Sequence, residues 1–195
     1  MKQILRTFIT CLLLLSTFVA VEAQTNVSGT INANTTWTTA GSPYIVTNTL
    51  TLSAGAVLNI SPGVVVKFSS YYSGIVLVNG TLNAIGNSAN PIVITSLKDD
   101  TYGGDSNNDG TATNPAAGNW DRIFISTEGS NSVLNHCIFR YGGASNNVVN
   151  TSNSSPTITN CVFENNGNSA LGLSGTSAPT ITNNHFANNQ YAPIA

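Results

Sequence analysis

The sequence predicts an all-β fold, a parallel β-helix (β-solenoid) wound from coils of about 23–25 residues with one long loop insertion. The segment that begins at Ser155 (SPTITNCVFENN) recurs, with four changes, as the segment that begins at Ala178. Short apolar pieces of strand character alternate with Asn, Gly and Ser, and no window has the period of an amphipathic helix. Because a unit this short cannot bury its apolar face alone, successive units are expected to stack, each strand pairing in parallel with its equivalent one coil later.

The amino-terminal segment, residues 1–23, has the features of an export signal peptide. Lys2 and Arg6 give it a positive start, and residues 8–20 form an apolar stretch that is shorter than the roughly 20 residues needed to span a bilayer. A membrane anchor is the alternative, and the polar residues within the stretch disfavour it. Residues 24–195 are therefore expected to be the mature β-helix domain of a secreted or cell-surface protein, without membrane insertion.

The amino-terminal half of the mature chain repeats more loosely than the carboxyl-terminal half. Its apolar segments recur at the spacing of one coil, or across one longer turn, and glycines punctuate them. The paired segments are residues 57–59 with 81–83, residues 50–52 with 75–77, and residues 64–68 with 92–94. Each pair is expected to lie on neighbouring coils.

The carboxyl-terminal half indicates how the side chains point within a coil. Alternation along a strand directs Ile158 inward and Thr159 outward, and Asn160 lies at a bend that needs the left-handed backbone that Asn tolerates. Equivalent residues of successive coils should then stack into columns. The expected columns are Phe139 with Phe163 and Phe186, Leu134 with Ile158 and Ile181, Asn160 with Asn183 through amides that hydrogen-bond between coils, and Val148 with Leu171 and Ile194.

Two cysteines remain after the signal peptide, and both belong to one inward column. Cys137 and Cys161 are one coil apart in the sequence, which places their α-carbons about one strand spacing, ~4.8 Å, from each other. That distance permits a disulfide, but side chains that point in parallel fit the geometry of the bond poorly. We expect two buried thiols that pack as small apolar residues.

Three segments have a pattern typical of a known superfamily: residues 58–64 (LNISPGV), residues 78–82 (VNGTL) and the repeated residues 158–163 (ITNCVF). Through them the chain resembles the right-handed parallel β-helix repeat proteins, the superfamily of pectate lyases and many large bacterial surface proteins. The resemblance covers nearly all of the mature chain. It implies right-handed winding, which is also the general rule for parallel crossovers. These segments are typical of the fold and do not include an active-site motif.

Residues 98–119 match no coil and form the predicted loop insertion, which holds four of the seven acidic residues after the signal peptide. Within it, residues 105–111 (DSNNDGT) match the first seven positions of a calcium loop. The predicted ligands are the side chains of Asp105, Asn107 and Asp109 and the carbonyl of Thr111. Because Ala116 stands where such a loop has Glu, a further carboxylate would come from Asp99, Asp100 or Asp121. The predicted cofactor is a structural calcium ion that pins the loop to the coil; a solvated acidic turn is the alternative.

The low charge of the chain limits the partners it can bind. Charged residues make up 7% of the sequence, against about a quarter in ordinary globular chains. After the signal peptide, four basic residues face seven acidic ones. Since nothing resembles the basic stripe that phosphate backbones require, nucleic acid is not an expected partner.

Three functions are compatible with these features, and no residue is assigned a catalytic role. The preferred prediction is a non-catalytic extracellular scaffold, an adhesin-like module that contacts polysaccharide or cell-surface glycans through exposed Tyr, Asn and Thr. The resemblance implies an alternative, a calcium-dependent polysaccharide lyase with Arg140, Lys67 or Lys98 as the base, or a glycoside hydrolase with paired Asp residues, although no pair of Asp residues lies on a strand. A second alternative is an ice-binding surface made by residues 157–159 stacked on residues 180–182, an array that residues 133–135 interrupt.

The last residues, 191–195, have the character of the beginning of another strand. Solenoids normally cover their final coil with a cap, and no cap sequence precedes Ala195. We therefore expect the β-helix to continue into further coils of the same chain.

Overall fold

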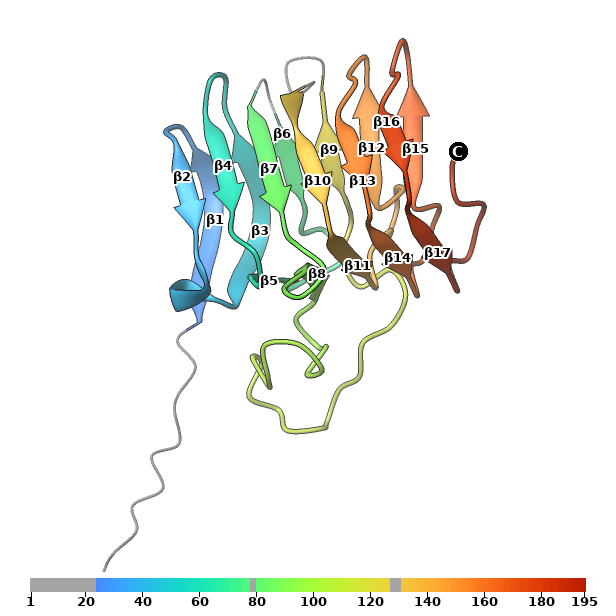
Figure 1. Ribbon diagram of the computed structural model, residues 1–195. Helices are drawn as coiled ribbons and strands as arrows, with labels where there is room; N and C mark the ends of the chain where they lie inside the picture. The colour runs from blue at the N-terminus through green and yellow to red at the C-terminus, as the bar shows by residue number, and fades with distance from the viewer. Residues whose placement is uncertain (1–23, 78–79, 127–130) are drawn as a thin grey trace, which may run out of the picture.

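The computed structural model describes residues 24–77, 80–126 and 131–195, and in it the chain is an all-β, right-handed parallel β-helix of about six turns. The predicted fold class is confirmed. All strand pairs in the described ranges are parallel, and helix is limited there to 3₁₀ turns such as η1 (Thr39–Gly41). Figure 1 shows the strands side by side along the solenoid. The predicted signal peptide lies outside the described residues.

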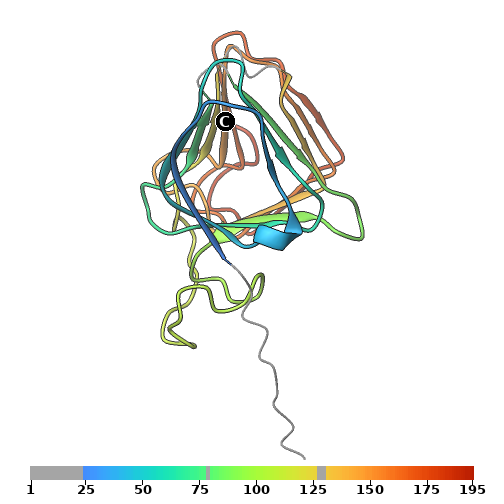
Figure 2. The same cartoon turned by 90° about the vertical axis from the view of Figure 1, so that its left-hand side faces the viewer.

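Each turn of the solenoid crosses three β-faces, which give it a triangular outline in Figure 2. The first half of β3 (Tyr44–Leu52) lies on face A and its second half on face B, and β1 (Thr25–Ile31) pairs along both halves. Face A continues through β5 (Val65–Phe68), β8 (Ile92–Ser96), β11 (Cys137–Arg140), β14 (Val162–Glu164) and β17 (His185–Ala187). Face B continues through β6 (Ile75–Leu77), β9 (Ile123–Ile125), β12 (Val149–Ser152) and β15 (Leu171–Ser174). Face C consists of β2 (Thr35–Trp37), β4 (Val57–Ile60), β7 (Thr81–Ile85), β10 (Val133–Asn135), β13 (Thr157–Thr159) and β16 (Thr180–Thr182).

The predicted columns of side chains fill the interior. The rings of Phe139 and Phe163 stack at 4.6 Å between centroids with 6° between planes, and Phe186 continues the stack at 5.4 Å and 14°. Leu134 pairs with Ile158, and Ile158 pairs with Ile181. The three pairs of segments predicted in the amino-terminal half also lie on neighbouring coils in the expected register. Burial of these apolar columns stabilises the stack and sets the register of its strands.

Left-handed residues form the bend between faces C and A. Asn160 and Asn183 have φ values of 55° and 56°, and His136 takes the same place one coil earlier with φ 50°. The amide of Asn160 does bridge two coils, but its nitrogen donates to Oδ1 of Asn135 at 2.9 Å, and not to the next Asn of the predicted column. The asparagines therefore serve the bend mainly through their backbone, because Asn adopts a positive φ more readily than most residues.

One predicted column has the wrong register. The sequence predicts Val148 opposite Leu171, whereas the structure pairs Val149 with Leu171, and Ile194 lies opposite Leu171 as predicted. Val148 and Val149 are both fully buried. The chain bends before β12, so two successive valines face the interior there, and the alternation of a straight strand cannot distinguish between them.

The two cysteines are free and buried, as the sequence predicts. The thiol of Cys137 donates to the carbonyl of Ala84 at 3.3 Å, and the thiol of Cys161 donates to the carbonyl of Thr159 at 3.2 Å. Burial raises the pKa of Cys137 well above the usual range of a thiol. These thiols are therefore part of the core.

Candidate cation site in the loop insertion

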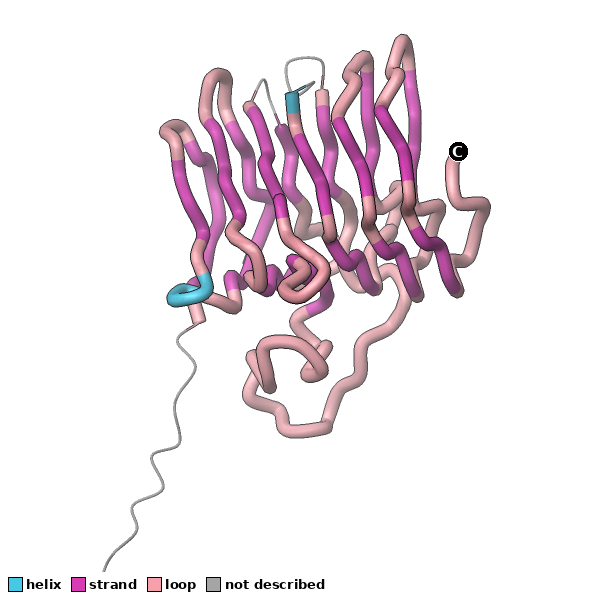
Figure 3. Tube along the Cα trace, in the orientation of Figure 1, coloured by secondary structure: helices cyan, strands magenta, loops and turns pink. Residues whose placement is uncertain are grey.

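The loop insertion lies at the corner between faces A and B. It connects β8, which ends at Ser96, with β9, which begins at Ile123, and it projects from the solenoid in Figures 1 and 3, where other turns are short. In an earlier turn of the solenoid, β3 runs through this corner as one strand. The insertion therefore replaces a corner and leaves the strand pairing on both sides intact.

Asp99 anchors the start of the insertion to the outer surface of face A. Its buried carboxylate accepts hydrogen bonds from the hydroxyl of Thr95 at 2.7 Å and from Arg140 at 3.1 Å. Arg140 also lies 2.9 Å from Glu164, and its guanidinium stacks over the ring of Tyr102, 5.3 Å from the centroid. These contacts join the loop to three consecutive strands of face A, which are β8, β11 and β14.

A second anchor lies on β5. The side chain of Lys67 is fully buried, and its ammonium donates to the carbonyl of Gly104 at 2.6 Å. Gly103 lies so close that a Cβ there would approach the Cβ of Pro43 to 3.2 Å. The first limb of the insertion thus covers the outer side of face A, where an outward-pointing lysine would otherwise meet solvent.

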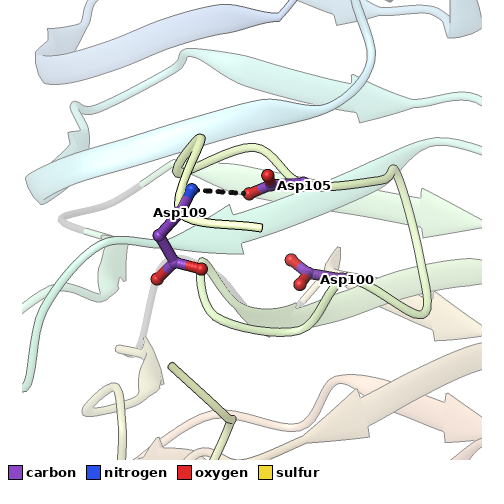
Figure 4. Close-up of side chains that lie close together, drawn as sticks. All are labelled: Asp100, Asp105 and Asp109. Atoms are coloured by element: carbon purple, nitrogen blue, oxygen red, sulfur yellow. Dashed lines mark hydrogen bonds between the residues drawn. The ribbon is translucent and has the colours of Figure 1, made fainter. Parts of the chain in front are cut away.

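Three carboxylates converge inside the insertion. Asp100, Asp105 and Asp109 each offer an oxygen, and these oxygens all lie within 4.8 Å of one another. Figure 4 shows the three side chains turned toward a common space. The backbone nitrogens of Asp109 and Gly110 donate to the two oxygens of Asp105 at 3.1 and 2.8 Å. Asn108 and Gly110, with φ values of 56° and 66°, make the sharp turn that brings the acids together.

Several oxygens of this cluster have no hydrogen-bond partner. Among the described residues, Oδ1 of Asp100, Asn107 and Asp109 are each buried and unpaired. Asn107 donates its amide to Oδ2 of Asp109 at 2.7 Å, and the hydroxyl of Thr113 donates to the same oxygen. Buried acceptors without partners cost roughly 1–3 kcal/mol each, and carboxylates this close also repel one another. A bound cation would remove both costs.

The structure separates the predicted ligands into two groups. Asp105, Asn107, Asp109 and Asp100 gather in the cluster, and Thr111 is exposed on the same turn. Asp99 lies outside the cluster in its contact with Arg140. Asp121 also lies elsewhere, because it accepts hydrogen bonds from Asn146 at 2.9 and 3.1 Å and lies 3.7 Å from Arg122.

Sequence reasoning missed Thr113, whose hydroxyl contacts both Asn107 and Asp109. It stands at the ninth position of the calcium-loop pattern. That position often takes part in binding through a water molecule, so the pattern contained a signal for this residue.

Two of the three candidate catalytic bases are held by structural contacts. Lys67 and Arg140 make the contacts given above, while Lys98 is exposed at the start of the insertion. Arg122 donates to Asn146 at 2.8 Å and stacks over Phe124 at 5.0 Å.

The threonines of the ice-binding alternative form two stacked pairs on face C. Thr157 pairs with Thr180 and Thr159 pairs with Thr182, and the preceding strand presents Val133 and Asn135 at these positions. The array is therefore two strands wide within the described part of face C.

Comparisons with protein-family models, with curated proteins and with solved structures found no match to this chain. No helix among the described residues is long and apolar enough to cross a membrane.

Proposed function

We propose that this chain is a secreted, non-catalytic β-helix scaffold of the pectate-lyase-like superfamily, with an insertion folded around a structural calcium ion and outer surfaces that contact glycans. The observation that carries the proposal is the set of converging oxygens of Asp100, Asn107, Asp105 and Asp109, several of them buried without a partner. Oxygen ligands of this kind are those that calcium prefers.

Calcium fits this oxygen set better than magnesium. Magnesium needs near-ideal octahedral geometry and gives up its water reluctantly, whereas calcium accepts irregular arrangements of about 6–8 oxygens. The loop supplies carboxylates from Asp100, Asp105 and Asp109 and an amide oxygen from Asn107, and water would complete the shell where Ala116 offers no carboxylate. The ion would tie the beginning of the insertion, at Asp100, to its tip.

The non-catalytic part of the proposal rests on the structural contacts of two of the three candidate bases, Lys67 and Arg140; the third, Lys98, is exposed. A lyase of this fold needs a basic side chain that can reach a substrate proton, beside its acids. Arg140 is held between Asp99 and Glu164, and Lys67 is buried beneath the insertion. These contacts favour a structural role for the charges on face A.

Calcium titration of the chelator-treated mature protein tests the ion. We expect one calcium per chain and thermal stabilisation that grows with calcium concentration, by about 2.7 kcal/mol at a hundredfold excess over Kd. Asp109→Asn and Asp100→Asn should each weaken binding about tenfold or more, because affinity follows the number of charged ligands. Asp121→Asn is the matched control and should bind within about twofold of the wild type. Absence of binding heat, or loss of binding in the control alone, would contradict the assigned cluster.

Incubation with acidic polysaccharides tests the absence of catalysis. The calcium-loaded protein is mixed with polygalacturonate and with alginate, and the reducing ends and unsaturated products are followed over time. We expect no products above the rate of a boiled sample. Sustained cleavage of either polymer would replace the scaffold with the lyase or hydrolase alternative.

A further inference from the structure

Face C carries no charged side chain on any of its six described strands. These strands, β2, β4, β7, β10, β13 and β16, turn only Thr, Asn, Val and Ile outward. The charged residues of the described ranges lie instead on strands of face A or in the segment that joins β8 to β9, which holds most of them. The insertion within that segment lies at the corner opposite face C in Figure 2. Charge is therefore confined to one side of the solenoid.

The outward residues of face C form two columns that run along the solenoid. One column consists of Thr36, Asn59, Asn83, Val133, Thr157 and Thr180. The second consists of Ile85, Asn135, Thr159 and Thr182. Because neighbouring strands of a sheet are about 4.8 Å apart, each column is a ridge of evenly spaced side chains with a groove beside it. A second surface with the same spacing can place its ridges in these grooves, as two packed sheets do.

The asparagines of these columns form hydrogen bonds along the face. The amide of Asn83 donates to Oδ1 of Asn59 at 3.0 Å. Oδ1 of Asn135 accepts from the hydroxyl of Thr159 at 3.3 Å and from the amide of Asn160 at 2.9 Å. Polar groups that already have partners lose less on removal from water than unpaired ones. Another surface can therefore cover these side chains at a small cost.

The centre of face C is apolar. Ile85 and Val133 point outward from β7 and β10, which are the two central strands of the six. The side chain of Ile85 is 44% exposed. Toward both ends of the face the outward residues are mainly Thr and Asn. An apolar centre within a polar rim is the usual arrangement of a protein–protein interface.

We infer that face C is the contact between two copies of this chain in a symmetric dimer. The two-fold axis lies in the plane of the contact and passes over β7 and β10, so that Ile85 and Val133 of both copies meet at the centre. Symmetric dimers are the commonest oligomers, and they use the same patch on both copies. The inference goes beyond the proposed function and needs neither a calcium ion nor a glycan.

The distribution of charge favours a second copy over a charged partner. A charged partner would find no counter-charge on the strands of face C, and it would lose its own hydration there. Contact through face C leaves both insertions, each with four acidic residues and one lysine, on the outer sides of the dimer. Salt screens repulsion between exposed charges over about 8 Å, so the two insertions would hardly oppose association.

The size of face C predicts a weak dimer. Six strands about 4.8 Å apart give the face a length of about 29 Å, and a strand of five residues such as β7 gives a width of about 16 Å. The resulting area of about 450 Å² per copy is below the about 800 Å² per copy of a standard interface. We therefore expect a Kd of about 10–100 µM. The Kd should depend little on salt, because no charge lies in the contact.

Sedimentation equilibrium of the mature chain in calcium-containing buffer, at concentrations up to about 1 mM, tests the inference. Ile85→Lys should raise the Kd about tenfold or more, because it places unpaired charges at the centre of the contact. Ile194→Lys is the matched control, since Ile194 is 43% exposed but lies beside Leu171 in the last coil, and it should dimerise as the wild type does. An equimolar mixture of Ile85→Lys and Ile85→Asp should associate more strongly than either variant alone, because opposite charges then meet near the axis. Far-UV circular dichroism should show the same fold in every variant, since Ile85 points to solvent.

Several outcomes would overturn the dimer. A wild-type chain that stays monomeric up to about 1 mM would exclude it, and a monomer that inhibits ice growth would assign face C to the ice-binding alternative. Association that Ile194→Lys abolishes and Ile85→Lys leaves intact would place the contact at the last coil. A Kd that rises steeply with salt would indicate a charged contact elsewhere. None of these results bears on calcium binding or on polysaccharide cleavage, so the proposed function is tested separately.

Discussion

Replacement of Arg140 tests whether a buried ion pair fastens the insertion to the solenoid. The guanidinium lies 3.1 Å from Asp99, whose side chain is 1% exposed, and 2.9 Å from Glu164, whose side chain is 30% exposed. Arg140→Met keeps most of the apolar stem and removes the charge. Glu164→Gln removes the outer partner and leaves the inner pair in place.

The two substitutions should differ widely in their effect on stability. Without Arg140, the buried carboxylate of Asp99 keeps its hydrogen bonds from Thr95 and from the backbone of Thr101 but has no counter-charge there. Removal of one partner of a buried pair typically costs about 3–5 kcal/mol. Removal of the partly exposed Glu164 should cost at most about 1 kcal/mol, because solvent screens that pair. We therefore expect a difference of about 2–5 kcal/mol in the free energy of unfolding.

Urea denaturation followed by tryptophan fluorescence measures this difference. Trp120 is buried, stacks on Phe68 at 4.5 Å, and donates its indole nitrogen to the carbonyl of Arg140 at 2.8 Å. A Trp37→Phe background shared by all variants makes Trp120 the single reporter. Equal losses in Arg140→Met and Glu164→Gln would refute the reasoning, as would additive losses in a double variant of Arg140 and Asp99.

Two further predictions concern the core. Phe163→Ala should lower the free energy of unfolding by about 3–5 kcal/mol in urea, because its ring is fully buried between two others. Phe186→Ala should lower it less, because that ring is only partly buried; equal losses would argue against the stack. Cys137 and Cys161 should resist alkylation in the folded protein because both thiols are buried, and intact mass should show both alkylated after unfolding. A mass lower by two hydrogens before reduction would instead indicate a disulfide.

The insertion buries residues on the outer side of face A. All five residues of β8 are buried, although alternate residues of a solenoid strand normally face solvent. Thr95, an outward position, is fully buried because Asp99 folds back onto it. A loop that follows one strand thus turns the outer surface of several strands into a second, polar layer. The proposed calcium ion lies within this same loop.

The sequence alone was sufficient for the repeated part of the molecule. Phe139, Phe163 and Phe186 recur at nearly constant spacing, and constant spacing in a solenoid places residues on top of one another. The left-handed bend at Asn160 followed from the same repetition, because the residue type suits the backbone it needs. In both cases the partner of a residue lies one coil away, so the period itself specifies the contact.

Only the tertiary structure decided the contacts of the insertion. The sequence could not predict which of Asp99, Asp100 and Asp121 joins the cation cluster, because the three have the same side chain and differ only in where the fold places them. In the structure, Asp99 contacts Arg140 and Asp100 lies near Asp105. Nor could the sequence predict that the hydroxyl of Tyr71 donates to the carbonyl of Ala144. Such contacts join segments that share no repeat, so their geometry depends on the whole fold. The coil period therefore determined the solenoid, and the non-periodic packing of one loop determined where its candidate sites lie.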